Sequence, residues 1–181
     1  IAFYTGPGNA LLDDWIAGLS EQKYDIDGRY SSAGKVDRDW VAECLHHPYF
    51  LQNPPKSLDR NMFSSYLSSL KEKNFTLENG AASLVSVTAH TIAKAGVFFS
   101  SPPLSWIIAG GGRHNPSLLK TLAQEVAGDV IDCDELGING DWIEAECFAY
   151  LAVRAKKGLP ISFPGTTGAN RPLTGGVVHG P

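Results

Sequence analysis

The sequence predicts an α/β domain, and three observations carry this prediction. Hydrophobic residues make up 43% of the 181 residues and charged residues only 19%, which is the balance of a globular chain. The apolar run over residues 104–109 has the length and composition of a buried parallel strand, and residues 129–133 are predicted to be a second short strand. Longer segments around them repeat their apolar residues at the spacing of helices.

The first half of the chain is predicted to be mostly helical. Residues 1–3 look like the end of a strand, and residues 5–8 form a turn rich in glycine and proline. Asn9 can then cap a helix that runs to residue 19. Residues 20–35 are predicted as loop, 37–45 as a short helix, and the proline-containing segment 46–57 as irregular. Helices follow over 60–73 and, capped by Asn79, up to residue 97, the second one apolar enough to be buried.

The second half alternates strands and helices. The run 104–109 is predicted to be a buried strand that ends in a glycine triplet. Asn115 and Pro116 open a helix to about residue 127, because proline is favoured at the first helical position. A strand over 129–133, a turn over 137–140 and a helix over 141–157 follow, and Gly158 ends that helix. No repeat or linker divides the chain, so residues 1–181 are predicted to form a single unit.

Charge and cysteine content argue against several classes of protein. The chain has 15 basic and 19 acidic residues and a net charge of −4, whereas a nucleic-acid binder normally carries a basic stripe. No apolar run approaches the ~18 residues of a membrane span, so no membrane partner is expected. The three cysteines, Cys44, Cys133 and Cys147, lack metal-site spacing and are predicted to be free buried thiols in a reducing cytoplasm.

The strongest candidate for a ligand site is the triplet Gly110, Gly111 and Gly112, followed by Asn115. Glycines between a strand and a helix let backbone N–H groups approach a ligand closely. The segment lacks the third glycine of a dinucleotide fingerprint and the Gly-Lys-Ser/Thr of a P-loop. The ribose, adenine or phosphate of a nucleotide would each suit this turn, and a tight turn without a ligand is the alternative.

A second candidate is the turn formed by Thr5, Gly6, Gly8 and Asn9. Its hydroxyl and exposed backbone amides, placed before a helix, suit a phosphate or a sugar hydroxyl. The alternative is a β-turn capped by Asn9, with no ligand.

Three further polar features have a functional and a structural interpretation. Glu144 either holds a sugar hydroxyl or completes a capping box with Asp141. Arg60 is either an anion clamp or, as is more common, part of a surface ion pair. Apart from one adjacent pair, the five histidines show no metal-ligand spacing, so no metal site is predicted. His90 lies in the middle of a predicted helix and is assigned to the core or to a helix face.

Taken in order, these segments resemble the anhydro-N-acetylmuramic acid kinase family nearly from end to end. The resemblance is carried by F-Y-T-G-P-G-N at residues 3–9, D-G at 27–28, G-K-V at 34–36, H-P-Y-F at 47–50, P-P-K-S at 54–57, I-A-G-G-G with Asn115 at 108–115, G-I-N-G-D at 137–141, E-A at 144–145, F-A-Y-L-A at 148–152, T-G-A at 167–169 and R-P at 171–172. Each motif alone is weak, whereas their shared order and spacing are specific.

The resemblance implies one lobe of a two-domain fold of the sugar kinase, Hsp70 and actin class, which is ribonuclease H-like, with extra helices. It implies a cytoplasmic enzyme of cell-wall recycling that uses ATP, Mg²⁺ and water to convert 1,6-anhydro-N-acetylmuramic acid to N-acetylmuramic acid 6-phosphate. The family's N-terminal half has no counterpart here, since the resemblance starts mid-family at Ile1. We therefore expect residues 1–181 to be a C-terminal lobe that is inactive alone, with an N-terminal lobe as its partner and a homodimer left open.

The resemblance also assigns roles to individual residues. Gly110, Gly111, Gly112 and Asn115 match the family's adenosine-side segment. Gly6 and Gly8 match the turn near the phosphates, Thr5 and Asn9 match the same turn near the sugar, and Glu144 matches a carboxylate near the sugar.

Tyr4 departs from the family pattern, because the family has its general-base aspartate at this position. A carboxylate with a pKa of ~4 is ionised at neutral pH, whereas a phenol with a pKa of ~10 is not. A weak or inactive kinase is therefore expected, or one that uses another base. The alternatives are a pseudokinase-like lobe that binds nucleotide or sugar without chemistry, a kinase for a related anhydrosugar such as levoglucosan, and an actin-like structural subunit.

Overall fold

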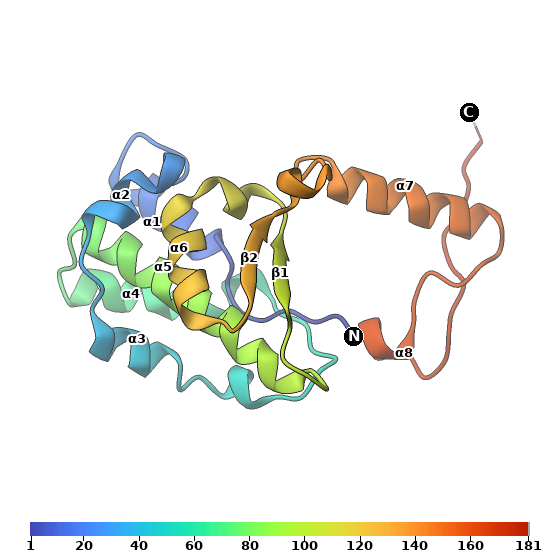
Figure 1. Ribbon diagram of the computed structural model, residues 1–181, viewed down its shortest axis with the longest axis horizontal. Coiled ribbons are helices and arrows are strands. Elements are labelled where there is room, and N and C mark those ends of the chain that lie inside the picture. The colour runs from blue at the N-terminus through green and yellow to red at the C-terminus, as the bar shows by residue number, and fades with distance from the viewer. Residues whose placement is uncertain (181) are drawn as a thin grey trace.

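The structure is a computed structural model, and it describes residues 1–180. Most of the chain is helical, and the two strands lie between the later helices (Figure 1). In chain order the elements are α1 (Ala10–Leu19), α2 (Arg29–Ala33), α3 (Arg38–Cys44), α4 (Ser64–Glu72), α5 (Leu77–Lys94), β1 (Ser105–Ile108), α6 (Pro116–Glu125), β2 (Asp129–Asp132), α7 (Ile143–Lys156) and α8 (Pro164–Thr167). Short 3₁₀ turns cover Ile26–Gly28, Pro48–Leu51, Arg60–Phe63, Ala95–Phe98, Gly111–His114 and Cys133–Leu136.

Helix α5 is the centre of the core and contacts α1, α2, α3 and α6. It is apolar over a wide arc, and eleven of its residues are buried. Trp15 of α1 is anchored to its first turn, where the indole Nε1 donates to the carbonyl of Leu77 at 2.9 Å. The segment Leu77–Phe98 is long and apolar enough to cross a membrane, but its position at the centre of this core is that of a core helix.

Strands β1 and β2 pair in parallel and form a two-stranded sheet, with Ser105 opposite Asp129 and Ile108 opposite Asp132. Helix α6 connects them and packs on both α5 and β2. The sequence predicted a buried strand here, yet β1 alternates between exposed and half-buried residues, and Ile107 is 53% exposed. The prediction of burial was wrong for this chain because only one face of the strand is covered.

Helix α7 extends away from the rest of the molecule, and the tail after it returns toward the N-terminus (Figure 1). No residue of α7 is buried, and its Phe148 is 72% exposed. The tail is attached to the first residues, where the amide of Ala2 donates to the carbonyl of Gly165 at 2.9 Å. The body of the chain is therefore residues up to about 140, with α7 as a projecting arm.

Five local predictions are corrected by the structure. Residues 1–3 form no strand, and the segment 20–35, predicted as a loop, contains α2. Asn9 precedes α1 but its side chain makes no capping hydrogen bond, because its backbone is already helical. Helix α5 is capped by Thr76 instead of Asn79, and the amide oxygen of Asn79 accepts from the backbone of Lys35 at 2.8 Å. Cys147 is exposed, whereas Cys44 and Cys133 are buried free thiols as predicted.

Candidate functional site

The glycine turn before α1 is shaped by close contact with α5. A Cβ added to Gly6 would lie 2.8 Å from Cβ of Thr91, so only glycine fits there. Gly8 has a φ of +58°, and its carbonyl accepts a 2.8 Å hydrogen bond from the Thr88 hydroxyl. The fold itself therefore accounts for both glycines, and a ligand at this turn is an additional role.

The glycine triplet after β1 presents an open backbone. Gly110 adopts φ +74° and ψ −177°, a conformation that only glycine adopts readily, and its amide donates to the carbonyl of Gly140 at 3.2 Å. Added Cβ atoms on Gly110 and Gly111 would meet nothing within 4 Å. On Gly112 a Cβ would lie 3.2 Å from Nδ2 of Asn9, so the two predicted glycine segments meet at this pair.

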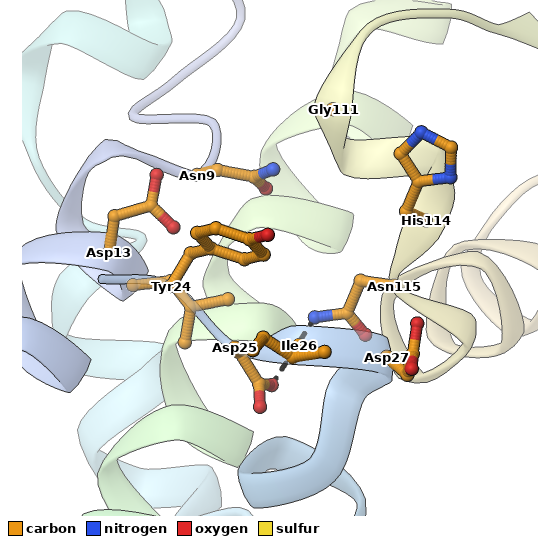
Figure 2. Close-up of a pocket in the computed structure, with 10 residues that line it drawn as sticks. Asn9, Asp13, Tyr24, Asp25, Ile26, Asp27, Gly111, His114 and Asn115 are labelled. Carbon is orange, nitrogen blue, oxygen red and sulfur yellow. Dashed lines mark hydrogen bonds between the residues drawn. The ribbon is translucent and has the colours of Figure 1, made fainter. Parts of the chain in front are cut away.

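A cavity of about 460 Å³ opens where the two segments meet (Figure 2). Three of the predicted site residues line it: Asn9, Gly111 and Asn115. Asp13, Tyr24, Asp25, Asp27 and His114 lie around the same space and were not predicted, since nothing in their local sequence indicates that they converge. Thr5 and Glu144 line neither this cavity nor the one at Tyr4 described below.

Asn115 forms part of the wall and its side chain is already engaged. Its Oδ1 caps α6 by accepting from the amides of Ser117 and Leu118, at 3.0 and 3.1 Å, which confirms the predicted helix start. Its Nδ2 donates to the buried carboxylate of Asp25 at 3.3 Å. Asp25 also accepts from the amide of Tyr30 at 2.8 Å. Asn115 and Asp25 thus join α6 to the segment before α2 and fix the shape of the cavity.

The cavity is acidic. The three carboxylates of Asp13, Asp25 and Asp27 line it, and no lysine or arginine does. The pKa of Asp13 is raised from 3.8 to about 6, mainly by burial, with a further increase from the nearby carboxylates of Asp14 and Asp25 and an opposing effect of Arg60. Such a space favours hydrogen-bond donors, for example hydroxyl or amine groups, over a bare phosphate, which the carboxylates would repel.

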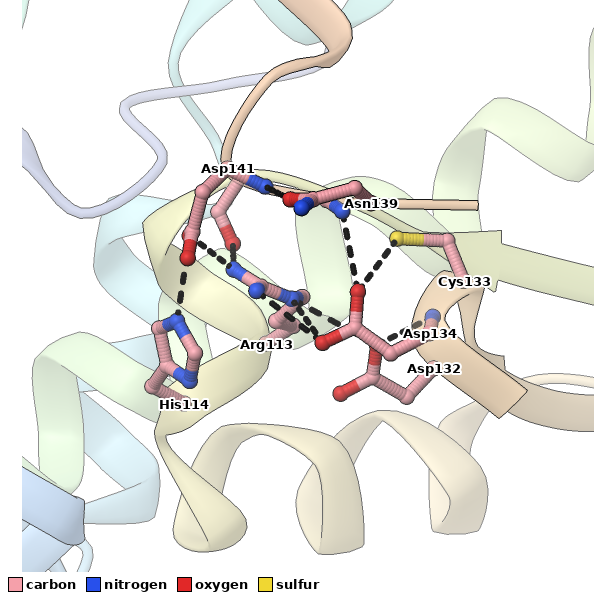
Figure 3. A network of polar contacts seen from close by, with 9 residues as sticks. Arg113, His114, Asp132, Cys133, Asp134, Asn139 and Asp141 are labelled. Atoms are coloured by element: carbon pink, nitrogen blue, oxygen red, sulfur yellow. Dashed lines mark hydrogen bonds and ion pairs between the residues drawn. The ribbon is translucent and has the colours of Figure 1, made fainter. Parts of the chain in front are cut away.

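Arg113 is the structural centre of the loops on the other side of the triplet (Figure 3). Its buried guanidinium donates to Asp141 at 2.6 Å and to Asp134 at 3.1 Å. The hydrogen bond from Arg113, followed by that from His114, lowers the pKa of Asp141 to about 2. Asp141 is therefore engaged by Arg113, and the capping box with Glu144, one of the two alternatives for that residue, does not form. Glu144 is exposed in the first turn of α7.

Asp132, Cys133 and Asp134 place three potential metal ligands within 4.8 Å of one another. Arg113 pairs with both carboxylates of this group, at 3.5 and 3.1 Å, and so already supplies the positive charge there. Sequence reasoning missed Arg113, although a basic residue inside a glycine turn with aspartates nearby in the chain was a usable signal. The two other polar side chains considered earlier have structural partners: Arg60 pairs with Asp14 at 2.6 Å, and His90 bonds to the carbonyl of Ser86 at 2.8 Å.

Tyr4 lies at a second cavity, of about 510 Å³, together with Lys56, Ser57, Thr166 and Thr167. Its backbone is held on both sides: its amide donates to the carbonyl of Lys56 at 3.2 Å, and its carbonyl accepts from the phenol of Tyr49 at 2.7 Å. The Tyr4 side chain itself is 59% exposed.

The fold and this geometry define the class of protein first: an α/β lobe, consistent with a kinase lobe, in which Gly111 of the strand-to-helix loop and Asn9 after the glycine turn line one cavity. A family model for anhydro-N-acetylmuramic acid kinase matches residues 1–180. The chain belongs to the anhydro-N-acetylmuramic acid kinase family.

Curated relatives named anhydro-N-acetylmuramic acid kinase align with the whole chain. The protein of Methylobacterium nodulans is 46% identical over 181 residues, which is 100% of this chain and 47% of the relative. The proteins of Methylorubrum populi and Paramagnetospirillum magneticum are 43% and 45% identical, and the match covers 47% and 51% of their lengths. The chain therefore spans about half the length of the curated relatives it matches.

Proposed function

We propose that residues 1–181 are the C-terminal lobe of an ATP-dependent anhydro-N-acetylmuramic acid kinase of the sugar kinase, Hsp70 and actin class. An N-terminal lobe would supply the rest of the cleft. The observation that carries this proposal is the meeting of Asn9 and Gly112, because it brings the family's two glycine segments to one cavity. The reaction would take ATP, water and 1,6-anhydro-N-acetylmuramic acid to ADP and N-acetylmuramic acid 6-phosphate.

The negative charge of the cavity indicates that the nucleoside and the phosphates of the nucleotide bind at different places. The nucleoside, which offers ribose hydroxyls and an exocyclic amine as donors, would occupy the acidic cavity beside Gly111 and Asp13. The phosphates would extend along the open backbone of Gly110 and toward the turn at Gly6 and Gly8. Asn115 would hold the wall of the cavity in place and would not bind the nucleotide directly, since its side-chain polar atoms are already hydrogen-bonded to Asp25 and to the amide of Ser117.

Mg²⁺ and ATP are the proposed cofactors. Mg²⁺ would neutralise the charge that develops on the phosphates. The carboxylates of Asp13 and Asp27 make no hydrogen bond within residues 1–180, but they line the cavity that is assigned to the nucleoside and so do not fit a Mg²⁺ bound to the phosphates. The ligands of that Mg²⁺ would come from the N-terminal lobe and from the phosphates themselves.

The sugar would lie between Tyr4, Thr5, Asn9 and Glu144. In the hydrolytic step, water forms a bond to the anomeric carbon as the bond from that carbon to O6 breaks, while O6 takes the phosphoryl group. The water proton needs an acceptor. Tyr4 stands where the family carries its aspartate, and a neutral phenol is a poor acceptor at neutral pH. We therefore expect slow turnover with this residue, in a protein located in the cytoplasm.

The test is a comparison of two preparations, the chain alone and the chain joined to a complete N-terminal lobe. ADP release and the mass of the sugar product are measured with ATP, Mg²⁺ and anhydro-N-acetylmuramic acid. The joined protein should form the 6-phosphate slowly and the lone chain should form none. If the joined protein binds nucleotide but forms no phosphorylated sugar, even after Tyr4→Asp, the kinase hypothesis is wrong. The chain is then a lobe that binds nucleotide without catalysis. Turnover by the lone chain at ordinary enzyme rates would refute the division into two lobes.

A further inference from the structure

The cavity at Tyr4 has the opposite charge character to the acidic cavity. Its lining includes Lys56 and the hydroxyl-bearing residues Ser57, Thr166 and Thr167, and it contains no carboxylate. The two threonine hydroxyls donate to the carbonyl of Phe163, so they are occupied within the tail. The groups left to donate into the cavity are therefore the Lys56 ammonium, the Ser57 hydroxyl and the Tyr4 phenol.

The Lys56 ammonium is held in place without a counter-ion. Its Nζ donates to the carbonyl of Tyr49 at 3.2 Å and lies 4.6 Å from the centre of the Tyr49 ring, with the rings of Phe98 and Phe3 at 5.3 and 5.8 Å. Within residues 1–180 no aspartate or glutamate pairs with it, whereas Lys73 and Arg60 each have a carboxylate within 3 Å. The side chain is half-buried, and this burial lowers the pKa of the amine.

A fixed ammonium has three N–H donors, and only one of them is used here. A partly desolvated cation without a counter-ion, on the wall of a cavity without carboxylates, favours an oxyanion as the missing partner. The aromatic rings around it fix its position while leaving its hydrogen-bonding capacity free.

We propose that Lys56, with Ser57, forms an anion-binding site that takes an oxyanion of the sugar substrate or product in the cavity beside Tyr4. This proposal rests on the proposed function, because the sugar is placed at Tyr4. Two oxyanions have the required chemistry: the carboxylate of the lactyl arm, which makes the substrate an acid, and the phosphoryl group of the product. The site would select acidic anhydrosugars if the carboxylate is the ligand.

A direct binding test needs no catalysis. Sodium D-lactate and inorganic phosphate are titrated separately into the 181-residue chain, while NMR follows the Tyr4 ring signals and the backbone amide of Ser57, which line the cavity and are present in every variant. Saturable shifts at these signals are expected in the wild type and in Lys56→Arg, and are expected to be lost in Lys56→Gln. Lys94→Gln is the matched control, because Lys94 also donates to a carbonyl at 3.2 Å and lies 5.9 Å from an aromatic centre, but it does not line the cavity. Equal shifts in the wild type and in Lys56→Gln would overturn the site.

A kinetic test then identifies the source of the oxyanion. In the joined kinase with Tyr4→Asp, Lys56→Gln should raise KM for anhydro-N-acetylmuramic acid by about tenfold to a hundredfold, the loss of one charge-assisted hydrogen bond. The anhydrosugar without a lactyl arm, anhydro-N-acetylglucosamine, should show no change in KM if the carboxylate is bound. A weaker inhibition by the 6-phosphate product alone would assign the site to phosphate. Unchanged KM and product inhibition, in an active enzyme, would refute the site while leaving the kinase assignment standing.

Discussion

The phenol hydroxyl of Tyr49 donates a 2.7 Å hydrogen bond to the main-chain carbonyl of Tyr4. Tyr49 is buried in the core beneath the first residues of the chain, and burial raises the pKa of its phenol. The bond fixes the backbone at position 4 independently of the side chain there, which projects outward. The side chain at position 4 can therefore be substituted while the backbone there stays in place.

Tyr4→Asp should raise kinase activity by at least about a hundredfold in the chain joined to an N-terminal lobe, the low end for general-base catalysis. The new carboxylate would be ionised at neutral pH, and the backbone contacts to Tyr49 and Lys56 would hold it in position. Tyr4→Phe is the control, since it supplies no base and should give no gain. A gain below about a hundredfold, with product formation measured directly, would contradict the assignment of the general base to this position.

Tyr49→Phe should lower the free energy of unfolding by about 1 kcal/mol, because it leaves the Tyr4 carbonyl without its donor. Urea denaturation followed by circular dichroism measures the difference. Tyr24→Phe removes a phenol that is 56% exposed and makes no hydrogen bond within residues 1–180, so it should be neutral. Equal losses in the two variants would mean that the bond to Tyr4 adds nothing to stability.

Gly6→Ala should destabilise the chain by about 1–3 kcal/mol, the range for overpacking a tight contact. The added methyl would be forced against the side chain of Thr91 on α5. Gly18→Ala is the contrasting change, because a Cβ there meets nothing within 4 Å and alanine favours the helix. Thermal unfolding should place the two variants on opposite sides of the wild type, and a neutral Gly6→Ala would contradict the close contact.

Asp13→Asn should stabilise the chain at pH 7.5 and give no advantage at pH 4. Since the folded state raises the pKa of Asp13 from 3.8 to about 6, it binds this proton more tightly than the unfolded chain. The stabilising contribution is complete below about pH 4 and is lost as the pH rises through 6. Asparagine cannot ionise and avoids that loss.

Melting temperatures measured from pH 4 to pH 8 test this expectation. Asp129→Asn, which removes an exposed carboxylate at the start of β2, serves as the reference and should follow the wild-type curve. Parallel curves for the wild type and Asp13→Asn would show that the Asp13 carboxylate carries no such cost.

Arg113→Gln should lower the denaturation midpoint far more than Arg60→Gln. The first change leaves Asp132, Asp134 and Asp141 without the buried guanidinium that gathers them. The second breaks an exposed pair, which is worth about 1 kcal/mol or less. Guanidinium denaturation measures the midpoints of the two variants. Similar midpoints would contradict the importance of Arg113 for stability.

Local chemistry made the strand, glycine triplet and α6 predictable, because the apolar run, the glycines and Asn115-Pro116 act within a few residues of one another. The contacts of Asn115 with Asp25 and of Gly6 with Thr91 join residues that lie 85 to 90 positions apart, and no periodicity indicates which of many polar residues will meet. For the same reason the acidic lining from Asp13 and Asp27 was not foreseen. The capping prediction for Asn9 was wrong because its backbone is already helical, and the capping box considered for Asp141 does not form because Arg113 engages that carboxylate.

Because α7 projects from the body, different parts of this chain should open with different free energies. The amides of α5, buried on nearly every side, should exchange with deuterium only when the whole body unfolds. Those of α7, where no residue is buried, should exchange through local opening that leaves the body intact. If an N-terminal lobe covers α7, its docking would appear as slower exchange along this single helix, and exchange there would report lobe association without any enzymatic assay.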